Sequence, residues 1–207
     1  MTLPRAALAA LLAVPATLAA LLSIDVGTWH DSLRAGDTRY RSAPAAARWD
    51  ASTVLPFGTG KALLALGDDV AARRAIRLFR VNYGVHGRLD TALQTQGARA
   101  VAELALADVT RSRDSRRAAQ ASDLLGVLAF GDFAGGGGRD AGQAERSVSA
   151  FANAVRLDPS DEAAKFNLEL ALRLFQARGV RPGASPGAGG HGTGRRGAGT
   201  GIPGTGY

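Results

Sequence analysis

The chain has 207 residues, and its 25 Lys and Arg side chains against 18 Asp and Glu give a formal net charge of +7. Cysteine is absent, which excludes disulfides, thiolate zinc sites, cysteine nucleophiles and lipoprotein acylation. The three histidines, His30, His86 and His191, lie far apart and give no metal-ligand spacing, so neither a metal nor a cofactor is expected.

The first segment is apolar enough to enter a membrane. Ala6–Ile24 spans 19 residues without a charged side chain. As a helix it would be roughly 28 Å long, close to the ~30 Å hydrocarbon core of a bilayer. It is either an uncleaved anchor or a cleaved secretory signal with Arg5 as its basic start. The run is longer than a usual signal core and no clean A-x-A site follows it, so residues 1–27 are predicted to be a transmembrane anchor.

The charges that flank this run favour one orientation. Arg5 and the amino terminus precede it, whereas Asp25 and Asp31 follow it before the next arginine, Arg34. Because cytoplasmic flanks are enriched in basic residues, the body of the protein is expected outside the cytoplasm. The predicted location is therefore the cytoplasmic membrane, with a single pass and an extracytoplasmic soluble part.

Residues 28–57 have mixed polarity, contain Pro44 and Pro56, and are predicted to be a juxtamembrane linker. Both tryptophans of the chain, Trp29 and Trp49, lie in this linker. Trp29 follows the apolar run, where an aromatic side chain would anchor the helix at the membrane interface. Ordinary packing beneath the helical region is the alternative role for Trp29.

Residues 58–178 are predicted to form one all-α domain. Alanine, leucine and arginine, which favour helices, dominate this region, and strand-like alternation is absent. Glycine, aspartate and proline interrupt the pattern at intervals, and Asp140 stands where it would cap a following helix. The helices expected between these breaks cover residues 59–66, 68–82, 90–110, 114–131, 141–156 and 160–178.

The last of these helices carries two apolar rows. The first row is Ala164, Leu168, Ala171 and Phe175, and the second is Phe166, Leu170 and Leu174. One row can pack on the preceding helices, whereas the other needs the linker, a partner or a second copy to cover it.

The final segment, residues 179–207, contains 12 glycines among 29 residues and no acidic side chain. It cannot bury enough apolar surface to offset the entropy of ordering, so a disordered Gly/Arg-rich tail is predicted. Its single arginine pair, Arg195-Arg196, and its one aromatic residue, Tyr207, are too few for an RNA-binding tail. Nucleic-acid binding is therefore not expected.

The sequence around Pro159 resembles a tetratricopeptide repeat. Phe151, Ala154 and Pro159 stand at the large, small and proline positions of the second half of that repeat, and Gly126 stands at a first-helix position. Ser147 departs from the pattern, because the repeat prefers alanine there. The resemblance implies antiparallel helix pairs that stack around a shared core.

The whole arrangement is also similar to a narrower family, the small membrane-anchored repeat proteins often called Bat proteins, which are associated with bacterial MoxR-type ATPases and von Willebrand A-domain proteins. The features that carry this resemblance are the anchor, the segment LDPSDEAAKFNLELAL at Leu157–Leu172, and the Gly-rich basic tail. It implies a scaffold or accessory role at the cytoplasmic membrane, with a von Willebrand A-domain protein or a MoxR-type ATPase as partner.

No residue pattern typical of catalysis is found. Gly60-Lys61 lacks the first glycine and the Ser/Thr of a phosphate-binding loop, and serine-nucleophile signatures are absent. The sequence therefore predicts a non-enzymatic, membrane-anchored helical-repeat scaffold that mediates protein–protein interaction in a bacterial envelope complex. The alternative is a secreted or periplasmic helical protein with a cleaved signal and an envelope-binding tail. The residues expected to bind the partner protein are Phe166, Asn167, Leu170 and Leu174.

Overall fold

The computed structural model describes residues 5–50, 52–55, 59–83, 92–135 and 140–181, and within these ranges it contains helices and irregular segments but no strand. The all-α class predicted from the sequence is confirmed for this part of the chain. The α-helices are α1 (Arg5–Ser42), α2 (Thr59–Leu63), α3 (Leu66–Tyr83), α4 (Ala92–Val109), α5 (Ser115–Gly135), α6 (Ala141–Leu157) and α7 (Glu162–Ala177), with one 3-10 turn, η1 (Pro44–Ala46). The predicted tail lies outside the described residues beyond Arg181.

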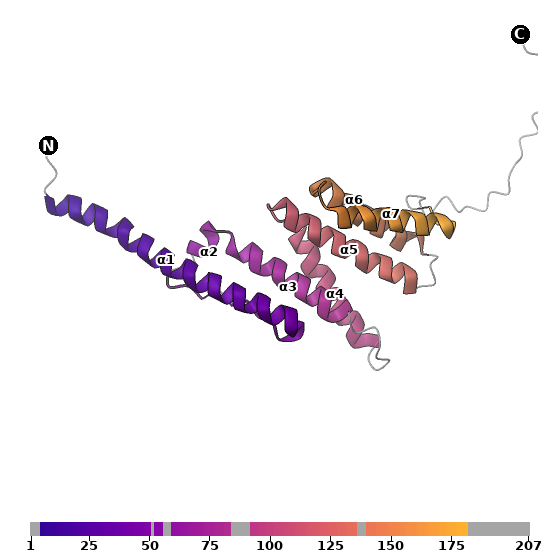
Figure 1. Ribbon diagram of the computed structural model, residues 1–207, viewed down its shortest axis with the longest axis horizontal. Helices are drawn as coiled ribbons and strands as arrows, with labels where there is room; N and C mark the ends of the chain where they lie inside the picture. Colours follow the sequence, from indigo (N-terminus) through magenta and orange to yellow (C-terminus); the bar gives the residue numbers. More distant parts are fainter. Residues whose placement is uncertain (1–4, 51, 56–58, 84–91, 136–139, 182–207) are drawn as a thin grey trace, which may run out of the picture.

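Helix α1 is 38 residues long and continues well beyond the apolar run. The boundary expected at residue 27 between anchor and linker falls inside it, because no proline and no cluster of helix breakers occurs between Asp25 and Ser42. The helix ends just before Ala43 and Pro44, where the proline disfavours helical backbone in the residue preceding it. Figure 1 shows the N-terminal half of α1 extending away from the other helices, with the N-terminus at its free end, whereas the C-terminal half lies beside α3.

Residues 12–20 of α1 are exposed. The side chains of Leu12, Val14 and Leu18 are 61%, 63% and 48% exposed. Among the described residues, α1 is the one helix long and apolar enough to cross a membrane. A single-pass membrane protein is consistent with this helix.

After η1 the chain turns back along α1 as an extended segment, residues 47–50 and 52–55, called the strap below. Its contacts run backward along the helix. The indole of Trp49 donates to Asp37 Oδ1 (2.9 Å), Ser32 Oγ donates to the carbonyl of Asp50 (2.5 Å), and the indole of Trp29 donates to the carbonyl of Ser52 (2.5 Å). Ser32 and Trp29 of α1 thus bond backbone carbonyls that an isolated extended segment leaves without partners.

The strap ends at a buried carboxylate. Asp25, on α1, is 0% exposed and accepts hydrogen bonds from Thr53 Oγ1 (2.6 Å), Val54 N (2.6 Å) and Leu55 N (3.1 Å). Three donors compensate for the removal of this charge from water, as buried carboxylates require.

The core consists of three clusters in a row. The first joins α1, the strap and α3 and contains Trp29, Ala47, Trp49, Leu66 and Val70. The second joins α3, α4 and α5 and contains Ala72, Ala75, Leu106, Val109, Ala121 and Leu128. The third joins α5, α6 and α7 and contains Phe133, Ala144, Phe151, Ala171 and Phe175. Because α3 and α5 each belong to two clusters, the helices form a continuous stack.

Helices α5 and α6 pack antiparallel and very closely. A Cβ added at Gly126 would lie 2.5 Å from the Phe151 ring, and Ser147 Oγ donates to the carbonyl of Gly126 (3.1 Å). One turn nearer the start of α5, Asn153 Nδ2 of α6 donates to Ser122 Oγ (2.8 Å). Gly126 therefore allows the buried Phe151 ring to rest directly on the backbone of α5.

The contact between α1 and the strap has a similar dependence on glycine, which gives a test. A Cβ at Gly36 would lie 2.5 Å from Trp49 Nε1 and 2.7 Å from the carbonyl oxygen of Arg48, whereas a Cβ at Gly27 meets nothing within 4 Å. We expect Gly36→Ala to destabilise the protein by about 1–3 kcal/mol through overpacking. Gly27→Ala should stabilise it by about 0.5–1 kcal/mol, because alanine favours the helix.

The measurement is thermal denaturation of the full-length protein in detergent, followed by tryptophan fluorescence, since both tryptophans lie at this contact. Gly36→Ala should lower the midpoint and shift the emission to the red, as Trp49 becomes more exposed to water. Equal melting of Gly36→Ala and wild type would show that the close approach of the strap does not contribute to stability.

Candidate functional site

The predicted binding residues lie on α7, and local contacts define where this helix begins and ends. Asp161 caps its first turn by accepting hydrogen bonds from Ala163 N (3.0 Å) and Ala164 N (3.1 Å). The chain leaves the helix through Gly179, which has a φ of 69°, a left-handed conformation that glycine adopts without steric cost.

One apolar row of α7 faces the other helices, as the sequence predicts. Ala164, Ala171 and Phe175 are at most 1% exposed, and Leu168 packs against the cluster shared with α5 and α6. The ring of Phe175 meets that of Phe133 edge to face, with centroids 4.6 Å apart. This row fixes the rotation of α7 about its axis.

The second row faces outward. Phe166 is 63% exposed and Leu170 is 40% exposed, while Leu174 is partly buried. The three residues are spaced by four and lie along one side of the helix. We call Phe166, Leu170 and Leu174 the outer row of α7.

Asn167 has a different role from its neighbours. Its Nδ2 donates to Asp123 Oδ1 of α5 (2.9 Å), and both residues are partly buried. Asn167 thus links α7 to α5, and the outer row lies beside this link. No local pattern marks Asp123 in the sequence, because its partner lies 44 residues away.

The surroundings of Asp123 raise the pKa of its carboxyl group. Burial raises the pKa of this carboxyl above its ordinary value, the hydrogen bond from Asn167 lowers it to a smaller extent, and the charge of Asp161 raises it further. The net effect is a raised pKa, so the ionised form is disfavoured in the folded protein.

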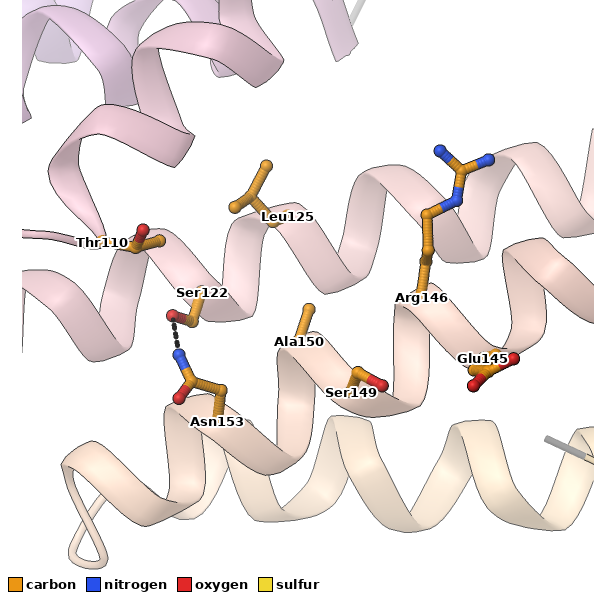
Figure 2. Close-up of a pocket in the computed structure, with 8 residues that line it drawn as sticks. All are labelled: Thr110, Ser122, Leu125, Glu145, Arg146, Ser149, Ala150 and Asn153. Carbon is orange, nitrogen blue, oxygen red and sulfur yellow. Dashed lines mark hydrogen bonds between the residues drawn. The ribbon is translucent and has the colours of Figure 1, made fainter. Parts of the chain in front are cut away.

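A groove lies between α5 and α6 on another part of the surface. Figure 2 shows Asn153 and Ser122 directed toward each other across the two helices, with Leu125 and Ala150 beside them. The cavity is about 490 Å³ in volume. Ser122 Oγ donates to the carbonyl of Ala118 (2.9 Å) and accepts from Asn153, so both of its hydrogen-bonding roles are used within the fold. The hydroxyl is therefore not arranged as an activated nucleophile.

Trp29 is a packing residue in the structure, which decides between the two roles that the sequence left open. It is 3% exposed and lies in the cluster with Trp49 and Val70. Within the described ranges, no group of three His, Asp or Glu side chains is placed to hold a metal ion.

Arginines of α3 form a further feature that periodicity alone did not reveal. Arg74 and Arg77 donate to strap carbonyls, those of Trp49 (3.3 Å) and Ala47 (2.6 Å), and both line a cavity together with Arg48. The only signal in the sequence is the recurrence of arginine along this helix, which also suits an ordinary solvated face.

Comparison of the chain with protein-family models, with curated proteins and with solved structures gives no match.

The raised pKa of Asp123 leads to a prediction about pH. A carboxyl whose pKa is higher in the folded than in the unfolded state contributes stability below its unfolded pKa, about 3.9, and loses it as the pH rises through the folded pKa. Asp123→Asn keeps a carbonyl oxygen for Asn167 and removes the titration. Between pH 3.5 and pH 7, we therefore expect the variant to gain stability relative to wild type as the pH rises, until the pH has passed the folded pKa of Asp123.

The measurement is the free energy of unfolding by urea at several pH values, with Asp108→Asn, an exposed carboxylate on α4, as the control. A constant difference between Asp123→Asn and wild type across this range would contradict the prediction.

Proposed function

We propose that the protein is a non-enzymatic, single-pass membrane scaffold that binds another protein through the outer row of α7. The observation that carries the proposal is that α7 exposes Phe166 and Leu170 on one side while another side, with Ala164, Ala171 and Phe175, is buried against the other helices. A row of large apolar side chains on a firmly held helix suits the docking of a partner's amphipathic segment.

The energetics are adequate for such a contact. Complete burial of a Phe or Leu side chain contributes roughly 1.5–3 kcal/mol. Single exposed apolar residues are ordinary on protein surfaces, but an aromatic and a leucine one turn apart, followed by Leu174, form a continuous strip. Phe166 also has the large rigid surface that is typical of interface hot spots.

The order of helix contacts supports a repeat-like architecture of the tetratricopeptide type. Helix α3 pairs with α4, α5 pairs with α6, and α7 contacts both α6 and α5. Gly126 and Phe151, which the repeat resemblance singles out, meet at the closest point of the α5–α6 pair. Ala154 is 0% exposed at the small-residue position.

Retention of the anchor is supported by the packing of α1. Leu22 packs against the cluster around Trp29, and Asp25 holds the end of the strap. Cleavage near Ser23–Val26, which the secreted alternative requires, would remove or disturb both contacts. The flanking charges support an extracytoplasmic position for the helical domain. By the Bat-type resemblance, the partner is a von Willebrand A-domain protein or a MoxR-type ATPase.

Substitutions on the two exposed sides of α7 test this surface. Leu170 and Leu172 are similarly exposed, at 40% and 44%, but they project about 200° apart around the helix. We expect Leu170→Asp to reduce recovery of the co-purified partner at least tenfold, because a carboxylate would enter the apolar contact. Leu172→Asp should bind as wild type does.

The assay is affinity purification of full-length protein from detergent-solubilised membranes, with mass spectrometry of the companions and circular dichroism to verify folding. Specific enrichment of a von Willebrand A-domain protein or a MoxR-type ATPase with wild type and Leu172→Asp supports the proposal. Equal loss of partner in both variants, or unfolding of Leu170→Asp, would remove the argument for the outer row. A soluble protein whose intact mass lacks the residues before Ser23–Val26 would establish the secreted alternative.

A further inference from the structure

A cavity lies between the strap and α3, away from the outer row of α7. It has a volume of about 250 Å³. Its lining comprises Ala47, Arg48, Trp49, Asp50, Arg74, Arg77 and Leu78. Three arginines and one aspartate thus line this small space between the strap and α3.

The three guanidinium groups are not neutralised by carboxylates of the described residues. Among the described arginines that are partly buried, as Arg77 is, the other three are paired: Arg73 with Asp37 and Asp69, Arg99 with Asp132, and Arg117 with Asp69 and Asp114. By contrast, Arg74 and Arg77 donate to backbone carbonyls of the strap, and the ion pairs of this part of the chain do not include Arg48, Arg74 or Arg77.

Arg77 has a donor that the fold leaves unused. Its Nη1 donates to the carbonyl of Ala47 (2.6 Å), but its Nε is buried and has no hydrogen-bond partner within the described structure. A buried N–H without an acceptor is costly, and Arg77 is also one of the residues that line the cavity.

From these observations we infer that the cavity binds the phosphate group of a soluble ligand. Its lining carries three positive charges and one negative charge, that of Asp50, and the resulting excess of two matches a phosphate dianion better than a carboxylate. The planar guanidinium groups offer paired donors to phosphate oxygens. The guanidinium of Arg77 has donors beyond the one that the carbonyl of Ala47 uses, and the exposed side chains of Arg48 and Arg74 can close over the anion from the rim.

The position of the cavity along α1 favours a soluble ligand over a lipid headgroup. Ser32, which bonds the carbonyl of Asp50, lies eight residues beyond Ile24. For a helix along the bilayer normal this is roughly 12 Å above the apolar run, whereas the headgroup layer is only about 5–8 Å thick.

The test is calorimetric titration of inorganic phosphate, and separately of O-phosphoserine, into full-length protein in uncharged detergent, with sodium chloride holding the ionic strength constant. We expect saturable binding by wild type and about tenfold weaker binding by Arg48→Gln and by Arg74→Gln. Arg48 makes no hydrogen bond or ion pair within the described structure, so Arg48→Gln should leave folding intact, which its melting curve verifies. The control is Arg181→Gln, an exposed arginine beyond α7, which should bind within twofold of wild type.

The outcomes show whether the site binds phosphate and which kind of molecule supplies the phosphate group. Tighter binding of O-phosphoserine than of inorganic phosphate would identify a phosphorylated molecule as the ligand, and the reverse order would identify free phosphate; both support the site. Absence of saturable binding by wild type, or unchanged binding by both Arg48→Gln and Arg74→Gln, would overturn it. Binding that appears only in micelles doped with phosphatidic acid would overturn the assignment to a soluble ligand. These results do not depend on the outer row of α7.

Discussion

The seating of the strap between α1 and α3 is the contact on which the arrangement of the molecule depends. The indole of Trp49 rests against the backbone of α1 at Gly36 and donates to Asp37. Asp37 is also paired with Arg73 of α3, which is in turn paired with Asp69. A helix that would otherwise be joined to the domain only through a loop is therefore held along half its length. The apolar half of α1 consequently has one direction relative to the helical stack.

The same constraint extends through the stack toward α7. Asp69 of α3 also accepts from Arg117 of α5, so charged pairs connect α1, α3 and α5 in sequence. Each core cluster shares a helix with the next, and the third ends at α7. In a stack of this kind every internal helix is covered on both sides, whereas the final helix of the described part lacks a following neighbour. Phe166 and Leu170 are therefore exposed because α7 is the last helix of the described stack, and no special local feature is needed to explain their exposure.

Sequence patterns predicted the helices α3 to α7 within a few residues, because apolar periodicity and capping aspartates are local signals. Asp140, for example, accepts from Gly142 N and Gln143 N, as a capping residue should. Sequence patterns do not predict that α1 continues to Ser42. The change in polarity after Ile24 reflects the surroundings of the helix and not the residue at which it ends. The strap depends on contacts such as Trp49 with Asp37, which no local pattern encodes. Two apolar rows on the last helix could be counted directly, but the bond between Asn167 and Asp123 required the fold.

The arginines of α3 connect the stability of the strap with its chemistry. A guanidinium group has five N–H donors, and a bond to a single strap carbonyl, such as that from Arg77 to Ala47, uses only part of this capacity. Lysine could satisfy the same carbonyl, but it would not present further donors in a fixed plane toward the cavity. An anion in the cavity would therefore bind α3 and the strap at once. Since the strap also bonds α1, occupancy would favour the docked state of the anchor by mass action, so ligand binding and the orientation of the domain on the membrane are thermodynamically linked.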